Sequence, residues 1–105
     1  MTTGKRLLGK LEPFAEKLTG IAEVHRLAIL YLLLHDPMEF RDIVRALKLP
    51  ANAVFHHIKQ MHTTGWLKRT KIGKRVTYEV NPKAFKELQE ALPDTYITRE
   101  LTKKA

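Results

Sequence analysis

The sequence predicts a mainly α-helical domain with a small β-hairpin. Apolar residues recur at intervals of three and four along most of the chain, and residues 76–80 alternate apolar and polar side chains. The distribution of charge is a further observation. Of the net charge of +8, +5 falls on residues 51–80, which contain six lysines and arginines and one glutamate. Such a concentration of positive charge is expected of a surface that binds a polyanion.

Two helices are expected in the first third of the chain. Apolar residues at helical spacing predict an amphipathic helix over about residues 5–18, and Pro13 is expected to shorten or kink it. A second helix is predicted over about residues 21–35. It is apolar almost all round, so we expect it to be the buried central helix of the domain.

A pair of helices joined by a tight turn follows. A short helix is expected over about residues 39–47, with its apolar residues on one face. Residues 48–50 form the connection, because Pro50 has the fixed φ angle that suits the first turn of a helix. The next helix is expected over about residues 51–63, ending before Gly65, which can adopt the left-handed conformation of a C-terminal cap.

A β-hairpin and a last helix complete the domain. The alternation in residues 76–80 predicts a strand, which pairs with residues 66–71 across a turn at residues 72–74. Asn81 is expected to cap a final helix over about residues 82–92. The resulting order, α-α-α-α-β-β-α, is that of a winged helix-turn-helix.

Length and composition indicate one small globular domain. We assign residues 1–92 to this domain, including both terminal helices, and residues 93–105 to a C-terminal tail. The chain has no cysteine, which excludes disulfides, thiolate metal sites and cysteine nucleophiles. The longest apolar run, residues 27–34, is far shorter than the roughly 20 residues that span a membrane. Since no signal peptide is visible either, we expect a cytoplasmic protein without a membrane partner.

Three stretches in order carry a resemblance to a known family. They are AEVHRLAIL at residues 22–30, VFHHIKQM at residues 54–61, and the hairpin sequence at residues 65–78. They are similar to the start of the central helix, the recognition helix and the wing of the arsenic-repressor-type (ArsR-like) winged helix-turn-helix transcriptional regulators. The resemblance implies a homodimer that binds duplex DNA and regulates transcription. Phe55 departs from the small polar residue that the family usually has, so its sequence preference cannot be carried over.

The helix over residues 51–63 has an apolar and a polar face. Val54, Ile58 and Met61 fall within an arc of about 60° and are expected to be buried. Residues on the opposite arc can bond base edges or phosphates in the major groove. These residues are Asn52, His56, Lys59, Gln60 and Thr63. A merely solvated face would show the same pattern, but the preceding turn and the basic hairpin favour DNA contact.

The hairpin carries long cationic side chains with no acid among them. Such side chains suit contacts with phosphates or the minor groove, although lysines also protect exposed strand edges. The cations are Lys68, Arg69, Lys71, Lys74 and Arg75. We therefore predict a sequence-specific, duplex-DNA-binding transcriptional regulator that represses by occluding its site.

No metal site, cofactor or catalytic site is expected. The thiolate motif that the resembled family has in its third helix is absent, and the final helix has no histidine. His56, His57 and His62 have spacings that do not place three imidazoles on one helical face, and we expect His57 to be a partly buried packing residue. No nucleophile–base arrangement or phosphate-binding glycine loop is present, so we expect no enzyme. The effector stays unknown.

The first and last helices have apolar residues beyond those that a single core needs. In the resembled family these helices form the two-fold dimer, which places the recognition helices about 34 Å apart. The residues expected at this interface are Leu7, Leu11, Leu18, Phe85, Leu88 and Leu92. Packing on the protein's own core would explain them as well.

Two other functions stay open. One is a winged-helix protein-interaction module, in which the basic hairpin binds an acidic protein. The other is a binder of double-stranded RNA or of single strands, which the scarcity of aromatic residues on the polar helix face disfavours.

Overall fold

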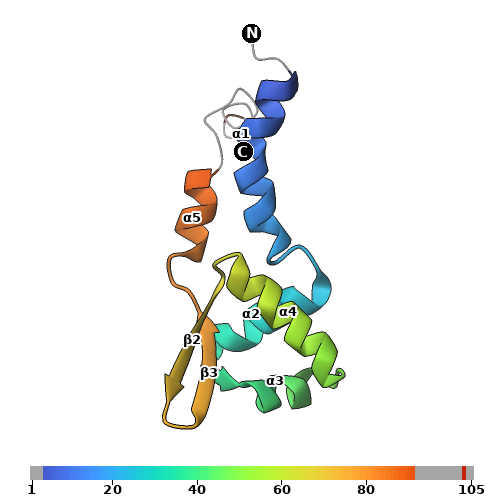
Figure 1. Ribbon diagram of the computed structural model, residues 1–105, viewed down its shortest axis with the longest axis vertical. Helices are drawn as coiled ribbons and strands as arrows, with labels where there is room; N and C mark the ends of the chain where they lie inside the picture. The colour runs from blue at the N-terminus through green and yellow to red at the C-terminus, as the bar shows by residue number, and fades with distance from the viewer. Residues whose placement is uncertain (1–3, 92–102, 104–105) are drawn as a thin grey trace.

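The computed structural model describes residues 4–91 and residue 103 (Figure 1). Its elements are α1 (Gly4–Thr19), α2 (Val24–His35), β1 (Met38–Glu39), α3 (Phe40–Leu47), α4 (Ala51–Thr63), β2 (Leu67–Ile72), β3 (Arg75–Val80) and α5 (Ala84–Ala91). The winged helix-turn-helix that the sequence predicts is confirmed. The expected tail, residues 93–105, lies outside the described residues apart from Lys103.

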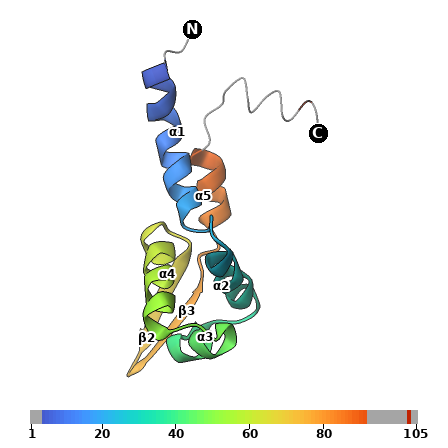
Figure 2. The ribbon, with the colours of Figure 1, turned by 90° about the vertical axis from the view of Figure 1, so that its right-hand side faces the viewer.

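The molecule is elongated and has two parts, as Figures 1 and 2 show. α1 and α5 lie side by side at one end, and α2, α3, α4 and the sheet form the other. The extents are 54 × 26 × 26 Å and the radius of gyration is 16.5 Å. A compact domain of this length has a radius of gyration of about 13 Å. The helical end therefore extends well beyond the core.

α1 has the predicted bounds to within one residue at each end, and Pro13 does not shorten it. The helix continues through this proline from Gly4 to Thr19. A proline inside a helix leaves a carbonyl of the preceding turn without its N–H partner. Since Pro13 is exposed, water can bond that carbonyl, and the helix is maintained.

α2 begins at Val24, three residues later than the sequence predicts. Glu23 stands before it with extended φ and ψ angles, and its carboxylate accepts hydrogen bonds from the backbone N–H groups of His25 and Arg26. The side chain thus satisfies two of the N–H groups that the first turn of a helix leaves free. Glutamate is not a common N-cap residue, which is why the sequence did not reveal this boundary.

The expectation that α2 is a buried central helix is only half right. One face supplies core residues, with Ile29, Leu30 and Leu33 at most 4% exposed. A second stripe at helical spacing stays uncovered within the chain. It consists of Val24, Leu27, Tyr31 and Leu34, which are 71%, 41%, 66% and 54% exposed. The protein therefore has an apolar surface on α2 that its own fold does not cover.

The sheet has three strands rather than two, in the order β1-β3-β2. β2 and β3 form the expected antiparallel hairpin, turning at Gly73, whose φ angle is +62°. β1 adds Met38 opposite Tyr78 and Glu39 opposite Thr77. A two-residue strand is too short to show alternation, so the sequence assigned Glu39 to the following helix, which begins at Phe40.

Trp66 joins the two parts of the molecule. It is fully buried, its indole N–H donates to the Lys17 carbonyl of α1 at 2.8 Å, and its ring meets Phe85 of α5 edge-on. Gly20, between α1 and α2, packs so close that a Cβ atom there would overlap the Thr64 hydroxyl and the Trp66 ring. The position of α1 relative to the core thus depends on this contact.

Candidate nucleic-acid interface

A tight turn connects α3 to α4. Lys48 adopts the left-handed conformation, with a φ angle of +54°, and its N–H donates to the Val44 carbonyl at the end of α3. Pro50 then stands at the start of α4, where its fixed φ angle of −59° allows the helix to begin at once. The two helices form the helix-turn-helix that the sequence predicts.

α4 has the bounds and the two faces expected of it. Val54, Ile58 and Met61 are at most 3% exposed and anchor the helix in the core. The five polar residues of the predicted DNA-binding face are all exposed: Asn52, His56, Lys59, Gln60 and Thr63. The Gln60 side chain also contacts α1, because its amide N–H donates a hydrogen bond to the Thr19 hydroxyl at 3.2 Å.

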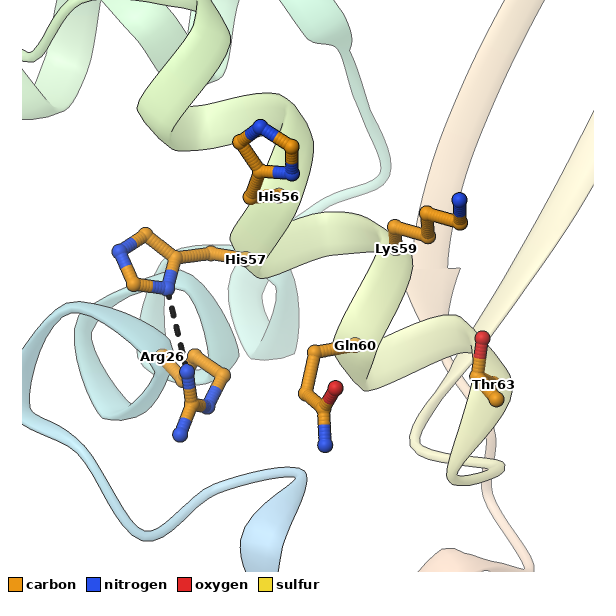
Figure 3. Close-up of a pocket in the computed structure, with 6 residues that line it drawn as sticks. All are labelled: Arg26, His56, His57, Lys59, Gln60 and Thr63. Atoms are coloured by element: carbon orange, nitrogen blue, oxygen red, sulfur yellow. Dashed lines mark hydrogen bonds between the residues drawn. The ribbon is translucent and has the colours of Figure 1, made fainter.

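A pocket of about 520 Å³ opens beside α4 and is shown in Figure 3. Arg26 of α2 approaches it and contacts His57, with 3.3 Å between its Nη1 and the imidazole Nδ1. The other residues of the lining are His56, Lys59, Gln60 and Thr63. Arg26 was not predictable as a neighbour of α4, because it lies 31 residues from His57 along the chain.

Phe55 lies on the other flank of α4. It is 52% exposed and borders a groove of about 350 Å³ between α4 and the sheet, together with Arg69 and Tyr78. Its ring meets His56 edge-on at a centroid distance of 5.8 Å. An aromatic side chain thus remains partly open to solvent next to the basic hairpin.

The β2–β3 hairpin, hereafter the wing, presents its five cations to solvent. Lys68, Arg69, Lys71, Lys74 and Arg75 are all exposed. Arg75 differs from the others, because its guanidinium donates to the Glu39 carboxylate of β1 at 2.8 Å. This contact lowers the pKa of Glu39 and raises that of Arg75. The expectation that no acid compensates the wing cations is therefore wrong for Arg75, whose charge is paired with that of Glu39.

A cluster of polar groups lies where α2 meets α4. His25 and Glu23 are 2.7 Å apart, and the His25 ring stacks on His57 at a centroid distance of 5.4 Å. Partial burial lowers the pKa of His57; Glu23 opposes this effect and Arg26 reinforces it. Desolvation would raise the pKa of Glu23, but hydrogen bonds from the His25 N–H, the His25 ring and the Arg26 N–H outweigh it and bring the pKa to about 2.

The residues expected at a dimer interface lie on the projecting end of the molecule. Leu7, Leu11 and Leu18 of α1 are half-buried, and Leu88 of α5 is half-buried against the core. Phe85 is 51% exposed, and Leu8 next to the stripe is 71% exposed. Leu92 lies outside the described residues. The two helices are joined within the chain by an ion pair of 2.8 Å between Lys17 and Glu87, which lowers the pKa of Glu87.

No described helix is by itself long and apolar enough to cross a membrane. α1 and α2 reach the necessary length and composition only when taken together, as a pair bent by 66°.

The architecture defines a winged helix-turn-helix protein of the DNA-binding transcription-regulator class. Residues 24–68 match the model of the arsR family of bacterial regulatory proteins. The chain is 33% identical to the transcriptional repressor PagR of Bacillus anthracis, with 76% of this chain and 93% of PagR covered and a TM-score of 0.62. The protein belongs to the ArsR family, as the sequence resemblance implies.

Other solved structures share the fold at lower identity. An ArsR-like transcriptional regulator from Rhodococcus sp. RHA1 has a TM-score of 0.77 at 16% identity, covering 92% of this chain and 87% of its own. NolR from Sinorhizobium fredii has a TM-score of 0.72 at 18% identity, covering 86% of this chain and 91% of its own. A search among curated proteins finds no significant match.

Proposed function

We propose that the protein is a homodimeric repressor that binds a specific duplex-DNA site with α4 in the major groove and the wing on the phosphates. The observation that carries this proposal is the distribution of charge. Lys59 on α4 and four wing cations are exposed, and among the described residues none of the five forms an ion pair. The four are Lys68, Arg69, Lys71 and Lys74. Cations without partners on one continuous surface are suited to phosphates.

The residue types on α4 support sequence readout rather than charge attraction alone. Asn52 and Gln60 have the paired donor and acceptor that bind an adenine edge, and Lys59 can donate to guanine. All three side chains leave the helix on its exposed face. Phosphate contacts from the wing would fix the register, while α4 would specify the sequence.

Uncovered apolar surface supports the dimer. Leu8, Phe85 and the α2 stripe remain exposed in the single chain, and exposed apolar patches on a protein surface often mark interaction sites. A two-fold pair of this molecule would bury part of this apolar surface and present two α4 helices to successive major-groove faces. Repression is supported by PagR, the relative of 33% identity, which is a transcriptional repressor.

Binding to duplex DNA should depend strongly on salt. If the dimer contacts about six phosphates, the logarithm of its affinity should fall with the logarithm of salt concentration at a slope of about −5. Fluorescence anisotropy with a duplex selected from random sequences measures this slope. A DNA affinity that does not change with salt concentration would contradict the proposal. It would favour the protein-interaction module, in which the wing binds an acidic protein.

The helix and the wing should have separable effects on binding. Asn52→Ala should cost roughly 1–3 kcal/mol on the preferred site and relax the sequence preference, because a base-reading amide is lost. Lys74→Ala should weaken binding to all sequences alike and reduce the steepness of the salt response by about one unit. Both residues are exposed, so neither change should disturb the fold.

Gln60→Ala is a second test of the helix, although it also removes the contact with Thr19. Lys10→Ala is the matched control for Lys74, since Lys10 is an exposed lysine at the α1 end of the molecule. If DNA selection recovers the same motif for Asn52→Ala and Gln60→Ala as for the parent, α4 does not read the sequence through this face.

A further inference from the structure

We propose that Glu23, His25 and His57 form a binding site for a divalent transition-metal ion of the Zn²⁺ type. One ligand atom of each residue lies within 4.8 Å of those of the other two. The residues come from different elements: Glu23 and His25 stand at the start of α2, and His57 lies in the middle of α4. An ion bound to all three would link these helices directly.

The distances are close to those that such an ion requires. Glu23 Oε1 lies 2.7 Å from His25 Nδ1, and the other carboxylate oxygen, Oε2, lies 3.6 Å from His57 Nδ1, so the Glu23 carboxylate lies between the two imidazoles. In a tetrahedral site with bonds of about 2.0–2.2 Å, neighbouring ligand atoms are separated by about 3.3–3.6 Å. Rotations of the three side chains, with Arg26 displaced from His57, would bring ligand atoms that now lie within 4.8 Å of one another to this separation. Two imidazoles and one carboxylate are a donor set that zinc accepts, with a fourth position for water.

Backbone capping and metal binding are compatible at Glu23. Its Oε2 accepts from the backbone N–H groups of His25 and Arg26 at 2.9 and 3.1 Å. Those bonds hold the carboxylate in place, as supporting hydrogen bonds commonly do for metal ligands. Among the described residues Oε1 contacts the His25 ring alone, so Oε1 and His25 Nδ1 can both face an ion when the imidazole proton is on Nε2.

The guanidinium of Arg26 lies next to the proposed metal site, where an ion would have to displace it from His57. Its Nη1 contacts His57 Nδ1 at 3.3 Å, and its Nε is buried without a hydrogen-bond partner among the described residues. Because an arginine can only donate, His57 presents the Nδ1 lone pair that a metal ion would use. Figure 3 shows Arg26 at the edge of the pocket beside α4, which gives the guanidinium room to move away.

The site is accessible to an ion from solvent. The side chains of His25, Glu23 and His57 are 44%, 29% and 20% exposed. The site is also distinct from the thiolate motif in the third helix and the histidine in the final helix, both of which this chain lacks. The expectation of no metal site depended on the spacing of His56, His57 and His62 within α4 and on the composition of the third and final helices. The present cluster combines α2 with α4.

The test is Zn²⁺ binding to the purified apo protein without DNA, so that it is independent of the proposed regulatory function. Equilibrium dialysis should show one tightly bound ion per chain, and Co²⁺ should give the intense visible absorption of a four- or five-coordinate ion. His25→Ala and His57→Ala should each weaken binding by more than about a hundredfold, since loss of even an outer-shell partner weakens metal sites tenfold or more.

His35→Ala is the matched control, because His35 lies at the other end of α2 and should leave binding unchanged. Zn²⁺ should also raise the melting temperature of the parent protein but not that of His25→Ala, since an ion that binds only the folded state stabilises it. Should His57→Ala fail to fold, the more exposed His25 carries the test. Undetectable binding to the parent, or binding that survives His25→Ala, would overturn the proposal.

Discussion

Leu8→Glu is expected to convert the proposed dimer into a monomer and to abolish tight DNA binding. Leu8 is 71% exposed in the single chain, so a glutamate there should leave the protomer folded. In a dimer built on α1 and α5, each protomer would bury the introduced carboxylate without a partner. Burying such a charge costs several kcal/mol. Since each 1.4 kcal/mol is a factor of ten, we expect dimer affinity to fall by about a thousandfold.

Leu8 is a sharper position for this test than Leu88. Leu88 also packs against the core of its own chain, so Leu88→Glu would disturb the protomer and the dimer together. Phe85→Glu is a second variant at the proposed interface, at the cost of the contact between Phe85 and Trp66. Circular dichroism of each variant would verify that the helices remain.

Sedimentation velocity at micromolar concentration measures the outcome. Leu8→Glu should sediment as a monomer where the parent is a dimer, and it should bind the selected duplex far more weakly although α4 is unaltered. Repression of transcription in vitro from a template with that site should be lost as well. Ile72→Glu is the control, because Ile72 is 76% exposed at the end of β2 and should leave the oligomeric state unchanged. The β2–β3 hairpin lies at the other end of the molecule from α1 (Figure 1). A parent that is monomeric at this concentration would refute the dimer.

The elements that carry the proposed interface were predictable because their signals are local. Val54, Ile58 and Met61 recur at helical spacing, and the cap at Gly65 follows directly, so the bounds of α4 were predicted correctly. Gly65 has the expected positive φ angle of 83°. The alternation at the end of the wing likewise predicted β3 within one residue. Each of these patterns depends on neighbours a few positions apart.

The features that the sequence did not reveal depend on distant residues or on a partner. Arg75 donates to Glu39, which lies 36 residues earlier in the chain, because the two-residue strand β1 pairs with β3 and brings this glutamate to the wing. His57 meets Glu23 only once α2 packs against α4. A helix that is apolar all round is expected to be buried, yet Tyr31 and Leu34 of α2 are exposed within one chain. If the dimer forms and covers this face of α2, the apolar residues all round the helix would reflect burial in the dimer rather than in the single chain.

Trp66→Ala is expected to cause the largest loss of stability among single changes in the core. Trp66 is fully buried and contacts α1 through its indole N–H and α5 through Phe85. Its ring also lies 5.3 Å from the Lys17 ammonium, which is in turn paired with Glu87. Removing a buried tryptophan side chain typically costs 3–5 kcal/mol, and we expect about 4 kcal/mol here.

Thermal unfolding followed by circular dichroism, at one fixed protein concentration, measures this effect. For a domain of this size each kcal/mol shifts the melting temperature by roughly 4–8 °C, so a fall of more than about 15 °C is expected. Trp66→Phe should cost less, because it keeps most of the apolar volume and loses mainly the bond to the Lys17 carbonyl, worth about 1 kcal/mol. Ile72→Ala, at the exposed end of the wing, should change stability by no more than about 0.5 kcal/mol. A Trp66→Ala protein that melts within a few degrees of the parent would show that the α1–α5 end does not depend on this residue.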